Sequence, residues 1–165
     1  MAIQDILTLI SASPWGVAMA QSPVLFPVVE CVHVVAITFV AGTIFMVDLR
    51  LLGLTARHQA VTQMTHEVLP WTWGAFVLAA ISGSMLFSSN ALGYYENGPF
   101  RFKALCMALA GVNMVIFHLV TQKSVKRWDQ NSATPAAAKI AGVLSLGFWI
   151  LIVAFARWVG FTIGS

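Results

Sequence analysis

Four long apolar runs dominate the sequence and limit what the chain can fold into. They cover about residues 24–52, 60–88, 99–124 and 136–161. A helix of about 20 apolar residues crosses the hydrocarbon of a bilayer, so each run is long enough to span a membrane. None of the runs alternates polar and apolar residues as transmembrane β-strands do. The sequence therefore predicts an all-α integral membrane protein with four transmembrane helices.

The composition supports a lipid environment. Hydrophobic residues make up 59% of the chain and charged residues only 9%, whereas a soluble domain carries roughly 25% charged residues. Such a chain cannot cover a water-facing surface, so we expect the lipid bilayer to be its main partner. The net charge is +3, but no basic run with interleaved aromatic residues points to nucleic acid.

The connections between the runs are short, which favours antiparallel packing of neighbouring helices in an up-down four-helix bundle. We expect residues 1–165 to form a single membrane domain. Residues 1–22 precede the first run, and we expect two short helices that lie in the membrane interface. The first is amphipathic, with an apolar side formed by Ile3, Ile6, Leu7 and Ile10. The second begins at Ser13 and Pro14, a helix cap followed by a proline in the first turn.

The first span carries ionisable residues that lipid penalises. At 100° per residue, Glu30, His33 and Asp48 fall within about 60° of one another on the helix. Intramembrane ionisable groups usually face the bundle interior and find partners there. We therefore expect Glu30 and His33 to form a functional site in the outer half of the bundle, roofed by the N-terminal helix. Asp48 and Arg50 are expected to form a charge pair at the opposite membrane edge, with Arg50 extending towards the headgroups.

Three histidines are candidate cofactor ligands, namely His33, His66 and His118. Haem in a helical bundle takes its axial ligands, usually His or Met, from facing helices. By their depth along the spans, His66 and His118 lie towards one end of the bundle, and they would share a cofactor only if Pro70 bends the second span. His33 lies in the other half, so it would need a separate partner such as Glu30, Met85 or Met107.

The third span presents a stripe that matches the polar face of the first span. The spacing of 4, 4, 3, 4 and 4 residues places on one side Lys103, Met107, Gly111, Met114, His118 and Gln122. The glycines Gly42, Gly83 and Gly111 would leave room for a flat macrocycle. We assign a structural or ligand-supporting role to the remaining polar residues of the spans, namely Asp48, Arg50, Lys103, Asn113 and Arg157.

A metal ion is the alternative ligand. Glu30 and His33 stand three residues apart, a spacing that places a carboxylate and an imidazole one helical turn apart. A diiron site needs two such motifs, and the chain has one. A single Cu, Zn or Fe ion held by His33, His118 and Glu30 remains an open interpretation, with Cys106 and Met107 as soft ligands for copper. The two cysteines lack CxxC spacing, which disfavours a zinc site built on them.

Several motifs resemble an uncharacterised family of small bacterial inner-membrane proteins with four helices. The motifs are His33 in the first span, "DLRLLG" at residues 48–53, "LPW" at residues 69–71, Phe100 with Lys103, and Arg157 with Trp158. The resemblance covers nearly the whole chain and implies a bacterial integral membrane protein. It implies no particular activity, because the family is defined by sequence.

Three functions remain open from the sequence. The first is a b-type haem protein that passes electrons, alone or as a subunit of an oxidoreductase, and the absence of a CxxCH motif excludes covalent haem attachment. The second is transport or handling of a metal ion or small solute. The third is a membrane anchor or assembly subunit without a cofactor. A chain of 165 residues would serve the first two functions as a homo-oligomer or with a partner redox subunit.

The topology follows from the distribution of Lys and Arg, which gather on the cytoplasmic side of membrane proteins. Six of the nine lie in or next to the two connections that follow the first and third spans, namely Arg50, Arg57, Lys123, Lys126, Arg127 and Lys139. The opposite side holds Arg101, Lys103 and Arg157. The asymmetry predicts that both termini face the periplasm of the bacterial inner membrane.

Reporter fusions test this topology. A periplasm-active reporter fused after Ser165 should be active, and the same reporter fused near Asn131 should be inactive, because the basic connections stay in the cytoplasm. The reverse pattern of activity would show that the charge asymmetry does not orient this chain.

Overall fold

A computed structural model describes residues 3–55, 60–121, 125 and 134–163 of the chain. These residues form helices without any strand. The elements are α1 (Ile3–Ser11), α2 (Pro14–Gln21), α3 (Leu25–Leu51), α4 (Val61–Ser89), α5 (Ala91–Glu96), α6 (Gly98–Ile116), the π-helical turn η1 (Phe117–Thr121) and α8 (Ala136–Thr162). Outside the described residues lie Arg57, Gln122, Lys123, Lys126, Arg127 and Asn131, on which parts of the topology and stripe predictions rest.

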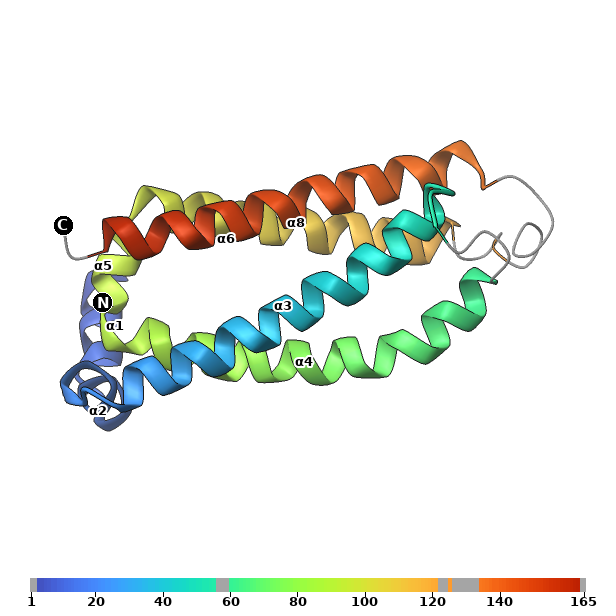
Figure 1. Cartoon of the computed structure of the whole chain (residues 1–165). Helices are drawn as coiled ribbons and strands as arrows, with labels where there is room; N and C mark the ends of the chain where they lie inside the picture. Colours follow the sequence, from blue (N-terminus) through green and yellow to red (C-terminus); the bar gives the residue numbers. More distant parts are fainter. Residues whose placement is uncertain (1–2, 56–59, 122–124, 126–133, 164–165) are drawn as a thin grey trace.

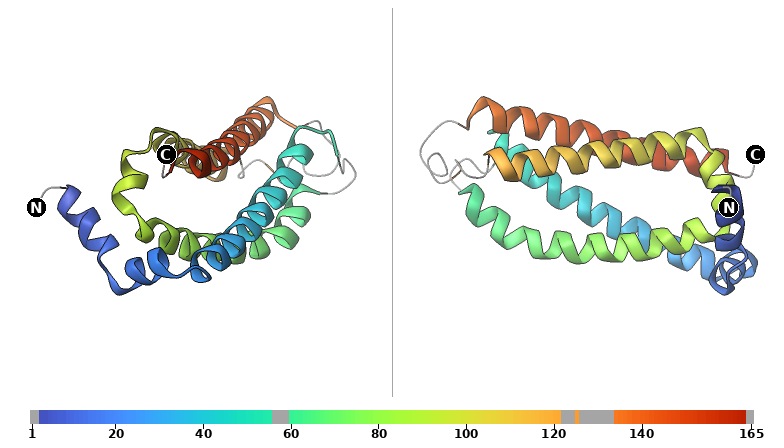
Figure 2. Two further views of the ribbon diagram at one scale, coloured as in Figure 1. Left: turned by 60° about the vertical axis from the view of Figure 1, so that its left-hand side comes forward. Right: turned by 180° about the vertical axis from the view of Figure 1, so that it is seen from behind.

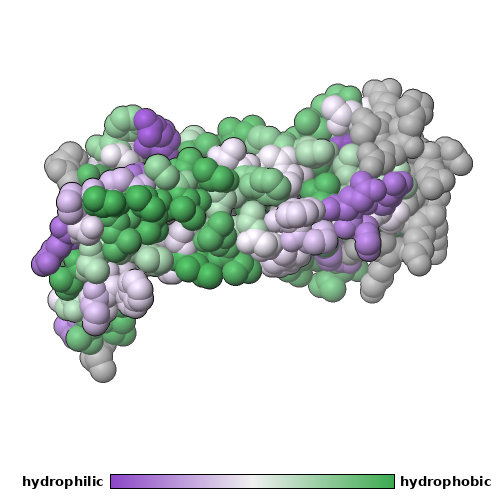
Figure 3. Space-filling view, turned by 60° about the horizontal axis from the view of Figure 1, so that its bottom comes forward, coloured by the Kyte–Doolittle hydropathy of each residue, from purple (hydrophilic) through white to green (hydrophobic). Residues whose placement is uncertain are grey.

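Four helices are long and apolar enough to cross a membrane, namely α3, α4, α6 continued into η1, and α8. Their surfaces carry many large apolar side chains, among them Val35, Trp71 and Phe161, each more than two thirds exposed. Figure 3 shows apolar residues over the middle of one face, with hydrophilic residues gathered towards the two ends. Water would penalise such a surface, so the helices are built to meet hydrocarbon. The predicted all-α membrane fold is confirmed.

The long helices form two antiparallel pairs, α3 with α4 and α6 with α8 (Figure 1). Helix α3 crosses obliquely between the pairs, so that it also packs on α8. We expected all chain neighbours to pack, and this was wrong for α4 and α6, whose described residues make no close backbone contact. The short helix α5 joins their ends and holds them apart. We call the end with α1, α2 and α5 the cap end, and the opposite end, where α3 stops and α4 and α8 begin, the loop end.

The helix starts at the cap end follow local sequence signals. The Ser13 hydroxyl accepts a hydrogen bond from the backbone N–H of Gly16 at 3.1 Å, with Pro14 in the first turn, as the sequence predicted. At the start of α6, the Asn97 side chain accepts from the N–H of Phe100 at 3.0 Å. The amide of Asn97 also donates to Thr162 on α8 at 2.8 Å, which ties the start of α6 to the end of α8.

Apolar contacts fill the interior in two places. The central cluster joins α3, α6 and α8 and consists of Val40, Ala41, Cys106, Trp149 and Ile152. A second cluster closes the loop end and consists of Leu51, Val61, Val125 and Ala138. The interior is thin, because most apolar residues of the four helices face outward.

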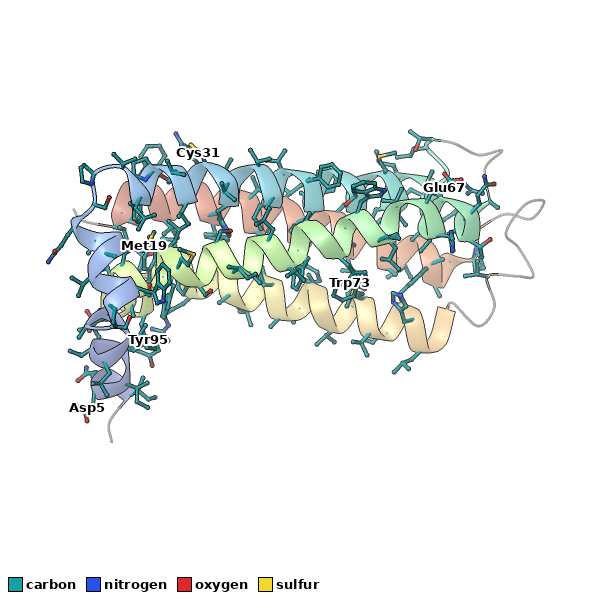
Figure 4. The ribbon with its side chains drawn as sticks, turned by 90° about the horizontal axis from the view of Figure 1, so that it is seen from below. Asp5, Met19, Cys31, Glu67, Trp73 and Tyr95 are labelled. Atoms are coloured by element: carbon teal, nitrogen blue, oxygen red, sulfur yellow. The ribbon has the colours of Figure 1, made fainter. Side chains whose placement is uncertain are left out.

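The N-terminal helices cover the cap end of the bundle. Helix α2 packs on the end of α4, and the side chain of Met19 is almost fully buried there (Figure 4). Helix α1 extends away from the bundle (Figure 2), with Leu7 buried and with Ile3 and Ile6 exposed. This exposed apolar side suits a helix that lies in the membrane interface.

Gly16 lies where α2 closely approaches the backbone of α1 and α4, and a larger side chain there should destabilise the protein. A Cβ at this position would lie 2.5 Å from the carbonyl oxygen of Ser11 and 2.7 Å from that of Ser88. Both atoms belong to the backbone and cannot swing aside, so Gly16→Ala should lower the free energy of unfolding by about 1–3 kcal/mol, as overpacking does. Thermal unfolding in one detergent, followed by circular dichroism, measures the effect.

Gly147 provides the matched control, because it also lies inside a helix, but a Cβ added to it would have no heavy atom within 4 Å. Gly147→Ala should leave stability unchanged or raise it by up to about 1 kcal/mol, since alanine is the better helix former. Equal melting temperatures for the two variants would contradict the close docking of α2 on α4.

Candidate functional site

His33 lies in the cap-end half of α3, at the contact with α4. Nδ1 of its imidazole is 3.0 Å from the hydroxyl oxygen of Ser82. The ring rests against Gly83, where a Cβ would come within 2.9 Å of Cε1 of His33. Any larger residue at position 83 would displace the imidazole. Gly83 therefore makes room for the ring of His33 itself and not, as the sequence suggested, for a macrocycle.

The hydrogen bonds of Ser82 indicate which nitrogen of His33 carries the proton. The Ser82 hydroxyl donates to the carbonyl of Leu78 at 2.7 Å. With the single proton of the hydroxyl on this carbonyl, the nearer of its two backbone acceptors, Nδ1 of His33 is the donor to Ser82. The carbonyl of Ala79 lies close enough to accept from the imidazole as well. In a neutral ring this arrangement leaves the lone pair on Nε2.

Charged groups from two helices interact electrostatically with His33. Electrostatic interactions connect it to Lys103 on α6 and to Glu30 on α3. Lys103 is partly buried, and its Nζ lies 4.9 Å from the centroid of the Phe100 ring. Glu30 is exposed. The site thus lies at the contact of α3 with α4, within electrostatic range of the start of α6.

An aromatic cluster forms the cap side of this site. The rings of Phe87, Tyr94 and Phe100 lie with centroids 5.4 to 6.0 Å apart and connect α4, α5 and α6. Burial raises the pKa of Tyr94, and the carboxylate of Glu30 raises it further. The phenol therefore stays protonated at neutral pH and can donate a hydrogen bond. Helix α2 packs on α3 and α4 at the same end of the bundle.

His118 lies at the other end, in the π-helical turn η1, and its side chain is exposed. Its Nδ1 donates to the carbonyl of Met114 at 2.9 Å, which again leaves the lone pair on Nε2. Turns of this π-helical type occur frequently at functional sites. His118 therefore has the same proton arrangement as His33, on a different helix and at a different depth.

The structure places His33 in a different half of the bundle from the other two predicted ligands. His66 is exposed near the start of α4, at the loop end, and α4 continues through Pro70 as one helix. No group of three or more His, Cys, Asp or Glu side chains lies close enough to hold a metal ion in the described part of the chain. Cys106 packs in the central apolar cluster, and Cys31 is exposed on α3 (Figure 4).

Asp48 and Arg50 do not form the membrane-edge charge pair that the sequence led us to expect. Both side chains are buried, with 5% and 6% exposure, whereas we expected Arg50 to extend out of the bundle towards the headgroups. The physical reason is that the last turns of α3 pack against α8 and the loop-end cluster. Residues two apart on a helix do not face each other, and the Asp48 carboxyl accepts a hydrogen bond from Ser145 on α8.

The remaining polar residues connect helices or pack on aromatic rings. The amide of Asn113 on α6 donates to the carbonyl of Ala141 on α8 at 3.0 Å. The guanidinium of Arg157 lies 5.0 Å from the ring centroid of Phe161 on its own helix. Sequence reasoning missed Ser82 and Ser145, the two hydroxyl partners. Ser82 stands seven residues before the end of α4, and His33 stands eight residues after the start of α3. Both helix ends lie at the cap end, so the similar depth of the two residues could have predicted their contact.

A family model for a "Family of unknown function (DUF6644)" matches residues 17–162 of the chain. The chain belongs to this family. The match includes all four spanning helices of this DUF6644 member and leaves α1 outside. No curated protein and no solved structure matches the chain. The family agrees with the resemblance found in the sequence, and the function has to be inferred from the site itself.

Proposed function

We propose that this DUF6644 member binds b-type haem and passes electrons in the bacterial inner membrane, with Nε2 of His33 as an axial ligand of the iron. The hydrogen bond from Nδ1 of His33 to Ser82 is the observation that carries the proposal. Metal-ligating histidines almost always donate the other ring N–H to an oxygen, which fixes the tautomer and orients the ring. A bound haem would supply one-electron chemistry at its iron.

Met107 is the best second ligand for the same iron. Eight residues separate Leu25 from His33 and nine separate Gly98 from Met107, so both lie about 12–14 Å from the cap-end start of their helices at 1.5 Å per residue. Met107 stands one turn beyond Lys103, whose charge acts on His33, and 44% of its surface is exposed. His118 stands twenty residues from Gly98, about 30 Å along the helix, and is too deep to share an iron with His33.

The side of α6 that carries Met107 has room for a flat apolar group. Gly111 lies on the same side of α6 as Met107 and has no heavy atom within 4 Å of a Cβ position. The described residues of α4 and α6 make no close backbone contact, which leaves room between the two helices beyond the aromatic cluster at the cap end. Lys103 would pair with a carboxylate of the haem at the cap end, because a partly buried ammonium gains most from an opposite charge.

The other two interpretations have less support. A Cu, Zn or Fe ion needs several donors at one point, and the described residues offer no such group around Glu30, His33 or His118. Cys106 cannot serve as a soft ligand beside His33 while it packs in the central apolar cluster. In both His33 and His118, a hydrogen bond at Nδ1 leaves Nε2 available as a ligand, and a cofactor-free anchor would not require this arrangement.

The site is closer to the cap end, which we place at the periplasmic face from the distribution of Lys and Arg. A single haem there would exchange electrons with a donor or acceptor at that face. We therefore propose that the chain works as a homo-oligomer or beside a partner redox subunit. In that assembly it would be the electron-transfer component of an oxidoreductase.

The optical spectrum of the purified protein tests the haem. Protein from haem-replete cells should show a Soret band and, after reduction with dithionite, a sharp α band, because two axial ligands give a low-spin iron. His33→Ala should lose the haem while the yield of folded protein stays the same. Met107→Leu should retain haem but lose the low-spin spectrum.

His66→Ala is the matched control, since His66 is an exposed histidine of a spanning helix at the loop end, and it should keep the full spectrum. A colourless, fully folded wild-type protein would refute the haem, and full haem content in His33→Ala would refute the ligand. Elemental analysis for Fe, Cu and Zn on the same sample separates the haem from a bound metal ion.

A further inference from the structure

Asp48 occupies an unusual place in the seam between α3 and α8. Its side chain is 5% exposed. Ser145 of α8 donates a hydrogen bond to the carboxyl group. The second oxygen, Oδ2, is buried and has no hydrogen-bond partner among the described residues. The backbone of α8 approaches closely here, because a Cβ at Gly142 would lie 3.4 Å from the carbonyl oxygen of Asp48.

No charged side chain in the described part of the chain offsets a negative charge on Asp48. Arg50 stands two residues away on the same helix, residues two apart on a helix do not face each other, and Arg50 is not among the groups that act on the Asp48 carboxyl. On α8, the basic residue closest in sequence to Ser145 is Lys139, and its side chain is exposed. On α4, His66 and Glu67 are exposed, and so is His118 of η1. Ser145 is the one polar side chain bonded to the carboxyl among these elements.

An ionised carboxylate in this seam would be strongly disfavoured. Burial of a charge without a partner is so costly that the group usually takes up or releases a proton and becomes neutral. A single hydrogen bond from a serine leaves most of the hydration of a carboxylate unreplaced. A protonated carboxyl can keep the bond from Ser145 on one oxygen and carry its proton on Oδ2, the oxygen that has no donor.

We propose that Asp48 is a proton-binding site of this membrane domain, closed by the α3–α8 seam. With the seam packed, Oδ2 holds the proton and Ser145 donates to the other oxygen. When the seam opens at the loop end, the O–H bond breaks, the proton passes to water, and the carboxylate is left hydrated. This site is independent of the haem proposal, because it lies on the other half of α3 and involves none of the haem ligands.

Infrared spectroscopy detects the proton directly. The full-length protein in vesicles should show the carbonyl stretch of a protonated carboxyl group, above the amide band, at a pH where exposed carboxyl groups are ionised. The band should shift in D2O and disappear in Asp48→Asn. Ser145→Ala should retain the band and move it to higher frequency, because the carbonyl loses its hydrogen bond.

Glu67→Gln is the matched control, since Glu67 is an exposed carboxyl group towards the loop end, bonded to Gln63 at 3.0 Å. This variant should leave the band unchanged. If wild type and Asp48→Asn have identical spectra in this region, Asp48 is ionised and the proposal fails. Should Asp48→Asn not fold, carboxyl 13C shifts of aspartate-labelled wild type decide the question, because one aspartate must stay protonated where the others have ionised.

Thermal stability gives a second readout with a defined sign. The folded state binds one proton more than the unfolded state, so the melting temperature of the wild type should fall relative to Asp48→Asn as the pH rises. At acid pH, where Asp48 is protonated in both states, the difference should be smallest. A wild type that gains stability over Asp48→Asn with rising pH would overturn the proposal.

Discussion

Hydrocarbon offers no hydrogen bonds to the polar side chains of the four spanning helices, so these side chains depend on partners within the protein. The partners come from neighbouring helices. His33 bonds to Ser82, the Thr72 hydroxyl donates to Thr43 at 2.9 Å, and the amide of Asn113 bonds to the backbone of α8. Because the apolar interior is thin, such bonds and close backbone contacts fix how the helices meet. Small residues allow that approach, as they commonly do between membrane helices.

Helix α3 connects the two halves of the bundle, and its polar residues meet different neighbours along its length. In the cap-end half, His33 contacts α4. In the loop-end half, Asp48 contacts α8. The oblique crossing of α3 therefore separates the half-buried His33 from the buried carboxyl group of Asp48. If both proposals hold, one helix carries an electron site near the cap and a proton site near the loops.

The sequence was sufficient for the fold class, because length and apolar composition leave few alternatives for a chain of this kind. It also located the helix start at Ser13, where a capping side chain and a proline act locally. The pairing of helices was harder to predict. Glu30, His33 and Asp48 share one side of α3, but a shared side meets different helices when the helix crosses the bundle, and only the structure shows that crossing.

The hydrogen-bond partners of the candidate residues could not be predicted from the sequence either. Ser82 and Ser145 read as ordinary small residues, because serines within helices usually bond to their own backbone. Ser82 does so and is hydrogen-bonded to His33 as well. The charge pair expected between Asp48 and Arg50 rested on closeness in sequence, whereas packing against α8 determines the surroundings of Asp48.

The proton position on His33 tests the central claim most directly, because the open Nε2 underlies the proposed ligand role. Nitrogen-15 NMR of histidine-labelled protein, freed of any cofactor, distinguishes the two tautomers, and His33→Gln assigns the signals. The structure predicts a neutral ring with the proton on Nδ1 at neutral pH, and a loss of this preference in Ser82→Ala. A proton on Nε2 that is unaffected by Ser82→Ala would contradict the account.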